Sequence, residues 1–349
     1  MDKIIRKISF DKKKISDLLL KYAIYFVLLI MIIVIIIEDS SIVSWRSLAT
    51  ILTQASTRCM LALGVGGIIV LAGTDLSIGR MVGLAGVVGA SLMQSPGFSR
   101  RIFPNLPTSG WFIALSILFI ILLITFASFI NGWLTAKLHI TPFIATLGMQ
   151  LVLYGAASSY YNALGGSPIT SLNEGFKYIA QGKLLKLKFG SDEFYISFLM
   201  IFALISILFI WFIWNKTRIG KNMFAVGGNA EAAAVSGVSI VKTTLIIYVI
   251  AGVLYGAAGL LELGRTGSAT NNLGLGYELD AISACVVGGV SLMGGVGSVA
   301  GIVTGVIIFQ VINFGLAYIG VDPYLQYVVK GMIILIAVAI DTRKYIKKK

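Results

Sequence analysis

The chain alternates between long apolar runs and short polar connections. The apolar runs lie at about 22–37, 48–72, 81–93, 111–134, 141–161, 194–214, 243–261, 278–293, 296–319 and 323–340. A helix that crosses a bilayer needs roughly 20 mainly apolar residues, and most of these runs reach or approach that length. The pattern predicts an all-α, polytopic membrane protein with about ten transmembrane helices.

The second run contains a charge. Its purely apolar part, 59–72, is too short to cross a bilayer at about 1.5 Å per residue. The preceding TQASTR segment must therefore also lie in the membrane and bring Arg58 with it. Because a charge is costly there, we expect Arg58 to be paired or to face the protein interior.

The composition agrees with a membrane location. Hydrophobic residues make up 57% of the chain, charged residues only 12%, and the mean hydropathy is +0.92. The net charge of +13 would suit a nucleic-acid partner, but the cations gather at the two ends and in 215–242. That distribution indicates membrane orientation instead. We expect a basic cytoplasmic segment at 1–20 and one transmembrane domain at 21–349.

The positive-inside rule gives the orientation. With ten spans, 18 of the Lys and Arg residues, Arg80 among them, fall in segments on one side, and 8 fall on the other. The richer side is expected to be the cytoplasm. The sequence therefore predicts that both termini and the 215–242 loop are cytoplasmic.

The 215–242 loop is the most informative polar segment. It is 28 residues long, which is more than a plain connection needs. Its centre, 230–235, favours a helix that Asn229 can cap and Gly237 can end. A helix outside the bilayer suggests a docking surface for a soluble partner. The alternative is an ordinary interfacial helix without a partner.

Several polar residues fall within apolar runs or at their mouths. Residues spaced by three or four share one face of a helix, and polar groups in lipid need partners. They form either a path for a solute rich in hydroxyl groups or the hydrogen bonds that join helices. The candidates for the path are Thr146, Gln150, Tyr154, Ser158, Tyr161, Gln310 and Asn313, with Asn271 and Asn272 in a Gly-rich loop at the outer mouth.

Four further cations are expected on the outer side: Arg46, Arg100, Arg101 and Arg265. They are candidates for docking an acidic external protein, and simple solvation is the alternative.

Metal and nucleotide chemistry find little support in the sequence. Cys59 and Cys285 lie in apolar surroundings, and His139 has no Cys or carboxylate cluster beside it. The nearest approach to a phosphate-binding loop, 237–243, lacks the second glycine before the lysine. We therefore expect no metal, no cofactor and no enzymatic activity, so that any use of ATP requires another polypeptide.

Six motifs in order resemble one known family. They read GTDLSIGRMVGL, NGWLTAKLHITPFIATLGMQ, NKTRIGKNMFAVGGNAEAAAVSGV, GRTGSATNNLG, YELDAISACVVGGVSLMGGVGSV and VDPYLQYVVKG. Together they are similar to the permease subunits of bacterial ABC sugar importers, the ribose, xylose and galactose permeases. Within that family the resemblance is nearest to the galactose/methyl-galactoside branch.

The resemblance implies a type II importer fold in the bacterial cytoplasmic membrane. It implies a homodimer of permease subunits, two ATP-binding subunits on the cytoplasmic side and an extracytoplasmic sugar-binding protein. It also implies that GGNAEAAAVSG is the coupling helix that contacts the ATPase. The coupling residues would be Gly228, Asn229, Glu231, Ala232, Ala233, Ser236 and Gly237.

The competing hypothesis is a stand-alone secondary sugar transporter or channel. Coupling to an ion would require a carboxylate within the membrane. The acids near the expected spans are Glu38, Asp75, Glu262, Glu278, Asp280 and Asp341, all at span ends. This placement favours the ATP-driven importer.

Overall fold

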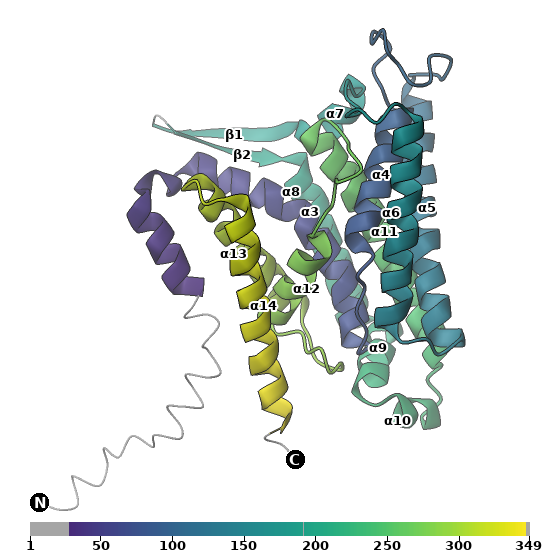
Figure 1. The fold of residues 1–349 in the computed structure, drawn as a ribbon. Coiled ribbons are helices and arrows are strands. Elements are labelled where there is room, and N and C mark those ends of the chain that lie inside the picture. The colour runs from purple at the N-terminus through teal and green to yellow at the C-terminus, as the bar shows by residue number, and fades with distance from the viewer. Residues whose placement is uncertain (1–27, 191, 347–349) are drawn as a thin grey trace, which may run out of the picture. The chain divides into compact units, whose positions relative to one another are not determined.

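The computed structural model describes residues 28–190 and 192–346 (Figure 1). The expected basic segment at 1–20 lies outside the described residues. The chain divides into two compact units. The larger unit is residues 44–310, and the smaller unit combines the described parts of 1–43 and 311–349. We describe each unit by itself.

The larger unit is a bundle of helices, as the apolar pattern predicts. Helix α11 lies at its centre and packs against α5, α3 and α4. The long or apolar helices are α3 (Trp45–Val70), α4 (Ile78–Leu92), α5 (Gly110–Lys137), α6 (Pro142–Ala163), α8 (Phe198–Lys216), α11 (Ile240–Thr266), α12 (Tyr277–Val287) and α13 (Val299–Tyr318).

Small residues let these helices approach closely. A Cβ atom on Gly252 would lie 2.7 Å from Thr125 Cα in α5, and one on Gly256 would lie 2.9 Å from Ile121 Cα. The two glycines are four residues apart on α11, the spacing that brings helix backbones together in membranes. Close packing is therefore one use of glycine in this bundle.

In the described part of the chain, five helices are long and apolar enough to cross a membrane: α3, α5, α8, α11 and α13. Shorter apolar helices lie at Leu28–Glu38, at α4 and at Pro323–Ile336. The chain is therefore a mainly helical, polytopic membrane protein, and the count of ten spans stays a prediction.

The segment before α8 differs from the expected plain loop. It contains helix α7 (Glu174–Gln181) and an antiparallel hairpin of β1 (Lys183–Phe189) and β2 (Asp192–Ser197). The span expected from about residue 194 therefore begins at Phe198. Alternating polar and apolar residues suit a strand better than a helix, and this accounts for the difference.

The eighth span was also predicted wrongly. The apolar run 278–293 suggested one continuous helix, but α12 ends at Val287. The following turn contains Gly289 and Gly294 with φ angles of +85° and +83°, which glycine adopts without strain. An 11-residue helix reaches only about 16 Å, so α12 alone covers part of the bilayer thickness and the glycine turn that follows it makes up the rest of the apolar run.

The contact between α12 and α13 is made by backbone. A Cβ atom on Gly301 would lie 2.1 Å from Gly288 O, and one on Gly305 would lie 2.0 Å from Ala284 O. We call this contact the glycine seam.

The smaller unit joins the two ends of the described chain. It contains the helix Leu28–Glu38, a 3₁₀ turn (Ser40–Ile42), the end of α13 and α14 (Pro323–Ile346). The Ser41 and Tyr318 hydroxyls form a hydrogen bond of 2.7 Å. A Cβ atom on Gly315 would lie 2.7 Å from Ile35 Cδ1, so the helices are in close contact.

Candidate functional site

Helix α10 (Ala230–Val235) is closed at both ends by its own sequence. Asn229 Oδ1 accepts a backbone N–H from the first turn at 2.9 Å, which is an N-cap. At the other end Gly237 has a φ of +82°, and the N–H of Val238 donates to Ala233 O at 3.0 Å. These are the bonds of a Schellman motif, and the predicted helix with both caps is confirmed.

The segment from Gly228 to Gly237 presents most of its residues to solvent. Val235 is 92% exposed and forms an apolar tip, whereas Ala233 is buried against the protein. The remaining exposed members are Gly228, Asn229, Glu231, Ala232, Ser236 and Gly237. A surface of small and polar groups around one valine is available for contact with another protein.

Backbone contacts fix this segment to the bundle through α9 (Arg218–Gly228). A Cβ atom on Gly227 would lie 1.7 Å from Val70 O, the last residue of α3. The N–H of Gly295 donates to the same carbonyl at 2.8 Å. The three backbones touch without intervening side chains, so the α9–α10 segment lies directly against the end of α3.

A polar group centred on Arg80 joins α4, α6 and the loop after α11. Its guanidinium lies 4.3 Å from the centre of the Tyr154 ring, a cation–π contact. Its Nη1 donates to Asn271 O at 3.4 Å, and Asn271 Nδ2 donates to Ser158 Oγ at 3.5 Å. Tyr154, Ser158 and Asn271, three of the path candidates, are thus brought together. Arg80 itself lies in helix α4, not in a segment that connects two helices.

The other path candidates on α6 lie apart from this group. Thr146 is fully buried and accepts the N–H of Leu76 at 3.1 Å, so it holds the loop between α3 and α4. Tyr161 is buried, and Gln150 is half-buried. Thr146 thus forms a structural hydrogen bond between two parts of the bundle, which is the second of the two roles considered for these polar residues.

The remaining path candidates are distributed over several places. Gln310 Nε2 donates to Gln54 Oε1 of α3 at 2.7 Å, which joins α3 and α13. Asn272 is exposed. Asn313 belongs to the smaller unit, where its Oδ1 is buried and finds no hydrogen-bond partner among the described residues.

An ion network around Glu262 joins α3, α11 and α12. Arg265 donates to Glu262 Oε2 through Nε at 3.0 Å and to Oε1 through Nη2 at 2.7 Å. Tyr277 donates to Oε1 at 2.7 Å, and Thr57 donates to Oε2 at 2.8 Å. Arg58 lies 4.0 Å from Oε1 and stacks over the Tyr277 ring. Arg58 is paired, as predicted.

Three of the four cations expected on the outer side have partners within the chain. Arg265 belongs to the Glu262 network, which already compensates its charge. Arg46 lies 3.7 Å from Glu193, and Arg101 donates to backbone carbonyls of its own loop. Arg100 is exposed. The sequence did contain a signal for the Arg265 pair, because Glu262 and Arg265 are three residues apart on a helix.

Sequence reasoning missed a buried polar group beneath the α3–α4 loop. Asp75 is fully buried, and its Oδ1 accepts the N–H and hydroxyl of Ser77 at 2.9 and 2.5 Å. Asn131 donates to Ser77 Oγ at 3.0 Å. Asp75 Oδ2 and the Tyr248 and Tyr255 hydroxyls are buried without a hydrogen-bond partner among the described residues.

Comparison with known proteins now identifies the chain. Residues 47–338 match the family described as the permease component of the branched-chain amino acid transport system. The chain belongs to this permease family. The match covers the bundle, the polar group at Arg80 and the α9–α10 segment.

Full-length relatives share about half of the residues. The galactose/methyl galactoside import permease protein MglC of Haemophilus influenzae is 51% identical over 98% of this chain and 99% of its own. The Escherichia coli protein of that name is 52% identical with the same coverage. The Escherichia coli ribose import permease protein RbsC is 34% identical over 85% of this chain and 86% of its own. No solved structure matches the chain.

Proposed function

We propose that the chain is the transmembrane permease subunit of an ATP-driven monosaccharide importer that carries galactose and methyl galactosides. The observation that carries this proposal is identity of 51–52% over 98% of the chain to import permeases with that named substrate. The chain transports and performs no catalysis, so ATP is hydrolysed by a separate subunit.

The proposal includes an assembly and an orientation. Two permease subunits form a homodimer of type II importer architecture, each with ten spans, in the bacterial cytoplasmic membrane. ATP-binding cassette subunits dock on α10 at the cytoplasmic side, where both termini lie. An extracytoplasmic sugar-binding protein delivers the sugar at the opposite end.

The contacts support a route for the mechanical step. ATP binding displaces α10, and the backbone contact of Gly227 with Val70 passes that displacement to α3. Gln54 and Arg58 on the same helix then move relative to their partners. A path that binds sugar weakly, through groups such as Tyr154 and Asn271, releases it readily, so sugar affinity resides in the binding protein.

Uptake by the reconstituted complex tests the function. The permease, its ATP-binding subunit and its binding protein are placed in vesicles, and labelled galactose, ribose and xylose are offered in parallel. We expect ATP-dependent uptake of galactose well above that of the pentoses. Equal uptake of all three sugars, or none, contradicts the assignment of the substrate.

One observation favours the second candidate, a secondary transporter. Asp75 is a buried carboxylate with one unpartnered oxygen, and an ion-coupled transporter needs such a group. In that case the lone protein takes up sugar down an ion gradient, and Asp75→Asn abolishes the uptake. Under the importer proposal the lone protein shows no gradient-driven uptake with or without the substitution.

A further inference from the structure

The β1–β2 hairpin has two chemically different faces. All seven residues of β1 are exposed. Because side chains alternate along a strand, Leu185, Leu187 and Phe189 lie on one face and Lys186 and Lys188 on the other. The hairpin projects from the end of the larger unit opposite α10 (Figure 1).

One covalent connection and one aromatic contact set the depth of the hairpin in the membrane. Strand β2 ends at Ser197, and the membrane-crossing helix α8 begins at the next residue. Trp45, the first residue of membrane-crossing α3, stacks on Phe189 with ring centroids 4.7 Å apart. Tryptophan is typical of the membrane–water interface. The hairpin thus lies where two spans enter the bilayer, with the apolar face toward Trp45.

The apolar face is too exposed for an aqueous environment. Leu185, Leu187 and Phe189 are 45%, 40% and 46% exposed. An edge strand that shows such a row to water is an aggregation site. In the boundary between headgroups and acyl chains the same row is covered by lipid.

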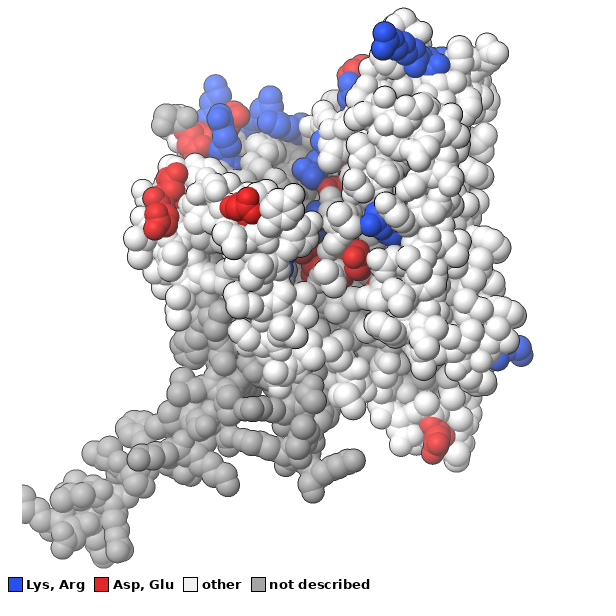
Figure 2. Space-filling view, viewed as in Figure 1, with Lys and Arg blue, Asp and Glu red and all other residues white. Residues whose placement is uncertain are grey.

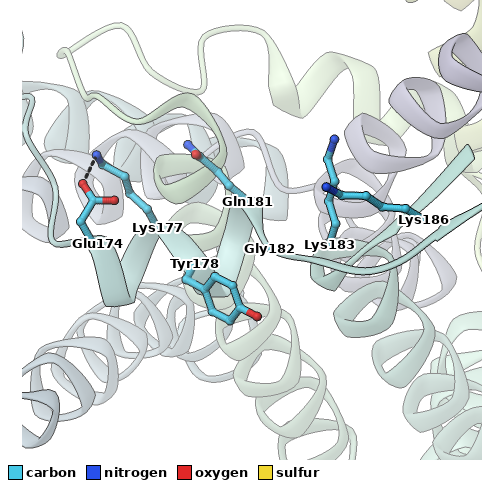
Figure 3. A pocket seen from close by; sticks show the side chains of 7 residues that line it. All are labelled: Glu174, Lys177, Tyr178, Gln181, Gly182, Lys183 and Lys186. Atoms are coloured by element: carbon cyan, nitrogen blue, oxygen red, sulfur yellow. Dashed lines mark hydrogen bonds and ion pairs between the residues drawn. The ribbon is translucent and has the colours of Figure 1, made fainter. Parts of the chain in front are cut away.

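The basic face offers unneutralised charge beside a concave surface. A pocket of about 520 Å³ lies at the base of the hairpin (Figure 3). On one side Lys177 is paired with Glu174 at 2.7 Å, and on the other side Lys183 and Lys186 extend from β1. Among the described residues neither Lys186 nor Lys188 forms an ion pair.

Cross-strand charge does not neutralise these lysines either. Glu193 lies directly opposite Lys188 in the hairpin, but its carboxylate pairs with Arg46. Figure 2 shows Lys and Arg side chains gathered over this end of the larger unit. A basic surface bordered by an apolar row matches the chemistry of an anionic phospholipid, which presents a phosphate above its acyl chains.

We propose that the β1–β2 hairpin is an interfacial lipid-binding element. Its apolar row lies in the acyl-chain boundary of the leaflet opposite α10, and Lys183, Lys186 and Lys188 bind the phosphates of anionic phospholipids. Nothing in this assignment depends on the transported substrate.

Spin-label accessibility along β1 tests the apolar half of the proposal. Cys59 and Cys285 are both buried, so a label directed to an introduced cysteine stays selective. Single cysteines replace Leu185, Lys186, Leu187 and Lys188 in the full-length protein in lipid nanodiscs. We expect oxygen, which dissolves in lipid, to reach positions 185 and 187, and a water-soluble nickel reagent to reach 186 and 188. Equal nickel access at all four positions overturns the proposal.

Lipid composition tests the basic half. Adding phosphatidylglycerol to phosphatidylcholine nanodiscs is expected to shift the label at position 187 deeper. Combined Lys183→Gln, Lys186→Gln and Lys188→Gln substitutions are expected to remove that shift. The matched variant neutralises three lysines near α10 (Lys216, Lys221 and Lys242) and is expected to keep it.

Two outcomes contradict the lipid assignment. If phosphatidylglycerol produces no shift in the parent protein, the lysines do not bind anionic headgroups. If the labels at 185 and 187 are shielded from both reagents, and become accessible to nickel when a bound protein is removed, the hairpin contacts protein instead of lipid.

Discussion

Gly227 is the residue at which a single methyl group has the largest expected effect. A Cβ atom added to Gly227 would lie only 1.7 Å from Val70 O, whereas a Cβ atom added to the neighbouring Gly228 would have no atom within 4 Å. Gly227→Ala must therefore separate α9 from α3, at a cost of roughly 1–3 kcal/mol. We expect a lower unfolding temperature and weaker ATPase coupling for Gly227→Ala, measured in detergent and in the reconstituted complex.

Gly228→Ala is the control for this substitution, because it adds the same methyl group to the same segment. It is expected to leave the unfolding temperature unchanged. Equal effects of the two substitutions would show that backbone contact with α3 is unimportant.

Glu262 is the charge on which the ion network depends. Its carboxylate is 2% exposed and compensates two guanidinium groups that are 18% and 28% exposed. Glu262→Gln leaves both cations without a counter-charge, and because they are partly hydrated we expect a loss of roughly 2 kcal/mol in the free energy of unfolding. The measurement is thermal unfolding of the purified protein.

Glu174→Gln is the matched control for Glu262→Gln. It also breaks a 2.7 Å pair with a neighbour three residues away, but its carboxylate is 82% exposed. Exposed pairs contribute little, so the unfolding temperature should not move. A similar loss for both variants would mean that burial does not determine the strength of the network.

At the scale of one element, helix α10 is stabilised by caps at both ends, and most of its side chains are exposed. Asn229→Ala removes the N-cap, worth about 1 kcal/mol of local helix stability, and Glu231→Ala removes a charge from the exposed first turn. We expect the double variant to insert normally but to retain less ATP-binding subunit during purification. Retention at the normal level would contradict the role of α10 in docking.

Two elements show why the ends of helices and strands were harder to predict than their presence. The hairpin could have been predicted, because residues 185–189 (LKLKF) alternate with a period of two, but it lies in a polar stretch that suggested a loop. The end of α12 was hidden by its hydropathy, since the apolar run continues past Val287 while Gly288 and Gly289 turn the chain. Apolar length alone does not reveal such a turn.

At the scale of the whole molecule, orientation is open to direct measurement. Val235 at the tip of α10 is 92% exposed, and Lys188 lies at the opposite end of the larger unit. On intact cells we expect a membrane-impermeant maleimide to label Lys188→Cys and to miss Val235→Cys until the cells are permeabilised. The reverse labelling pattern would invert the proposed topology.

The helices and the α10 caps were predictable because their signals are local. Asn229 and Gly237 act on residues next to them, and apolar length is read directly from the chain. The partners of Arg58 and Arg80 were not predictable, because Glu262 and Asn271 lie about 200 residues away and meet them only after folding. The burial of Asp75 was not predictable for the same reason, because it arises only when the helices pack together.

The glycine seam between α12 and α13 constrains how this protein can vary. Where two helices meet through side chains, a bulky replacement on one side can be offset by a smaller one on the other. At Gly288, Gly301 and Gly305 the nearest neighbour is a backbone carbonyl oxygen, which no second substitution can remove. These three positions should therefore tolerate no other amino acid, and a random-mutagenesis screen for transport should recover none there.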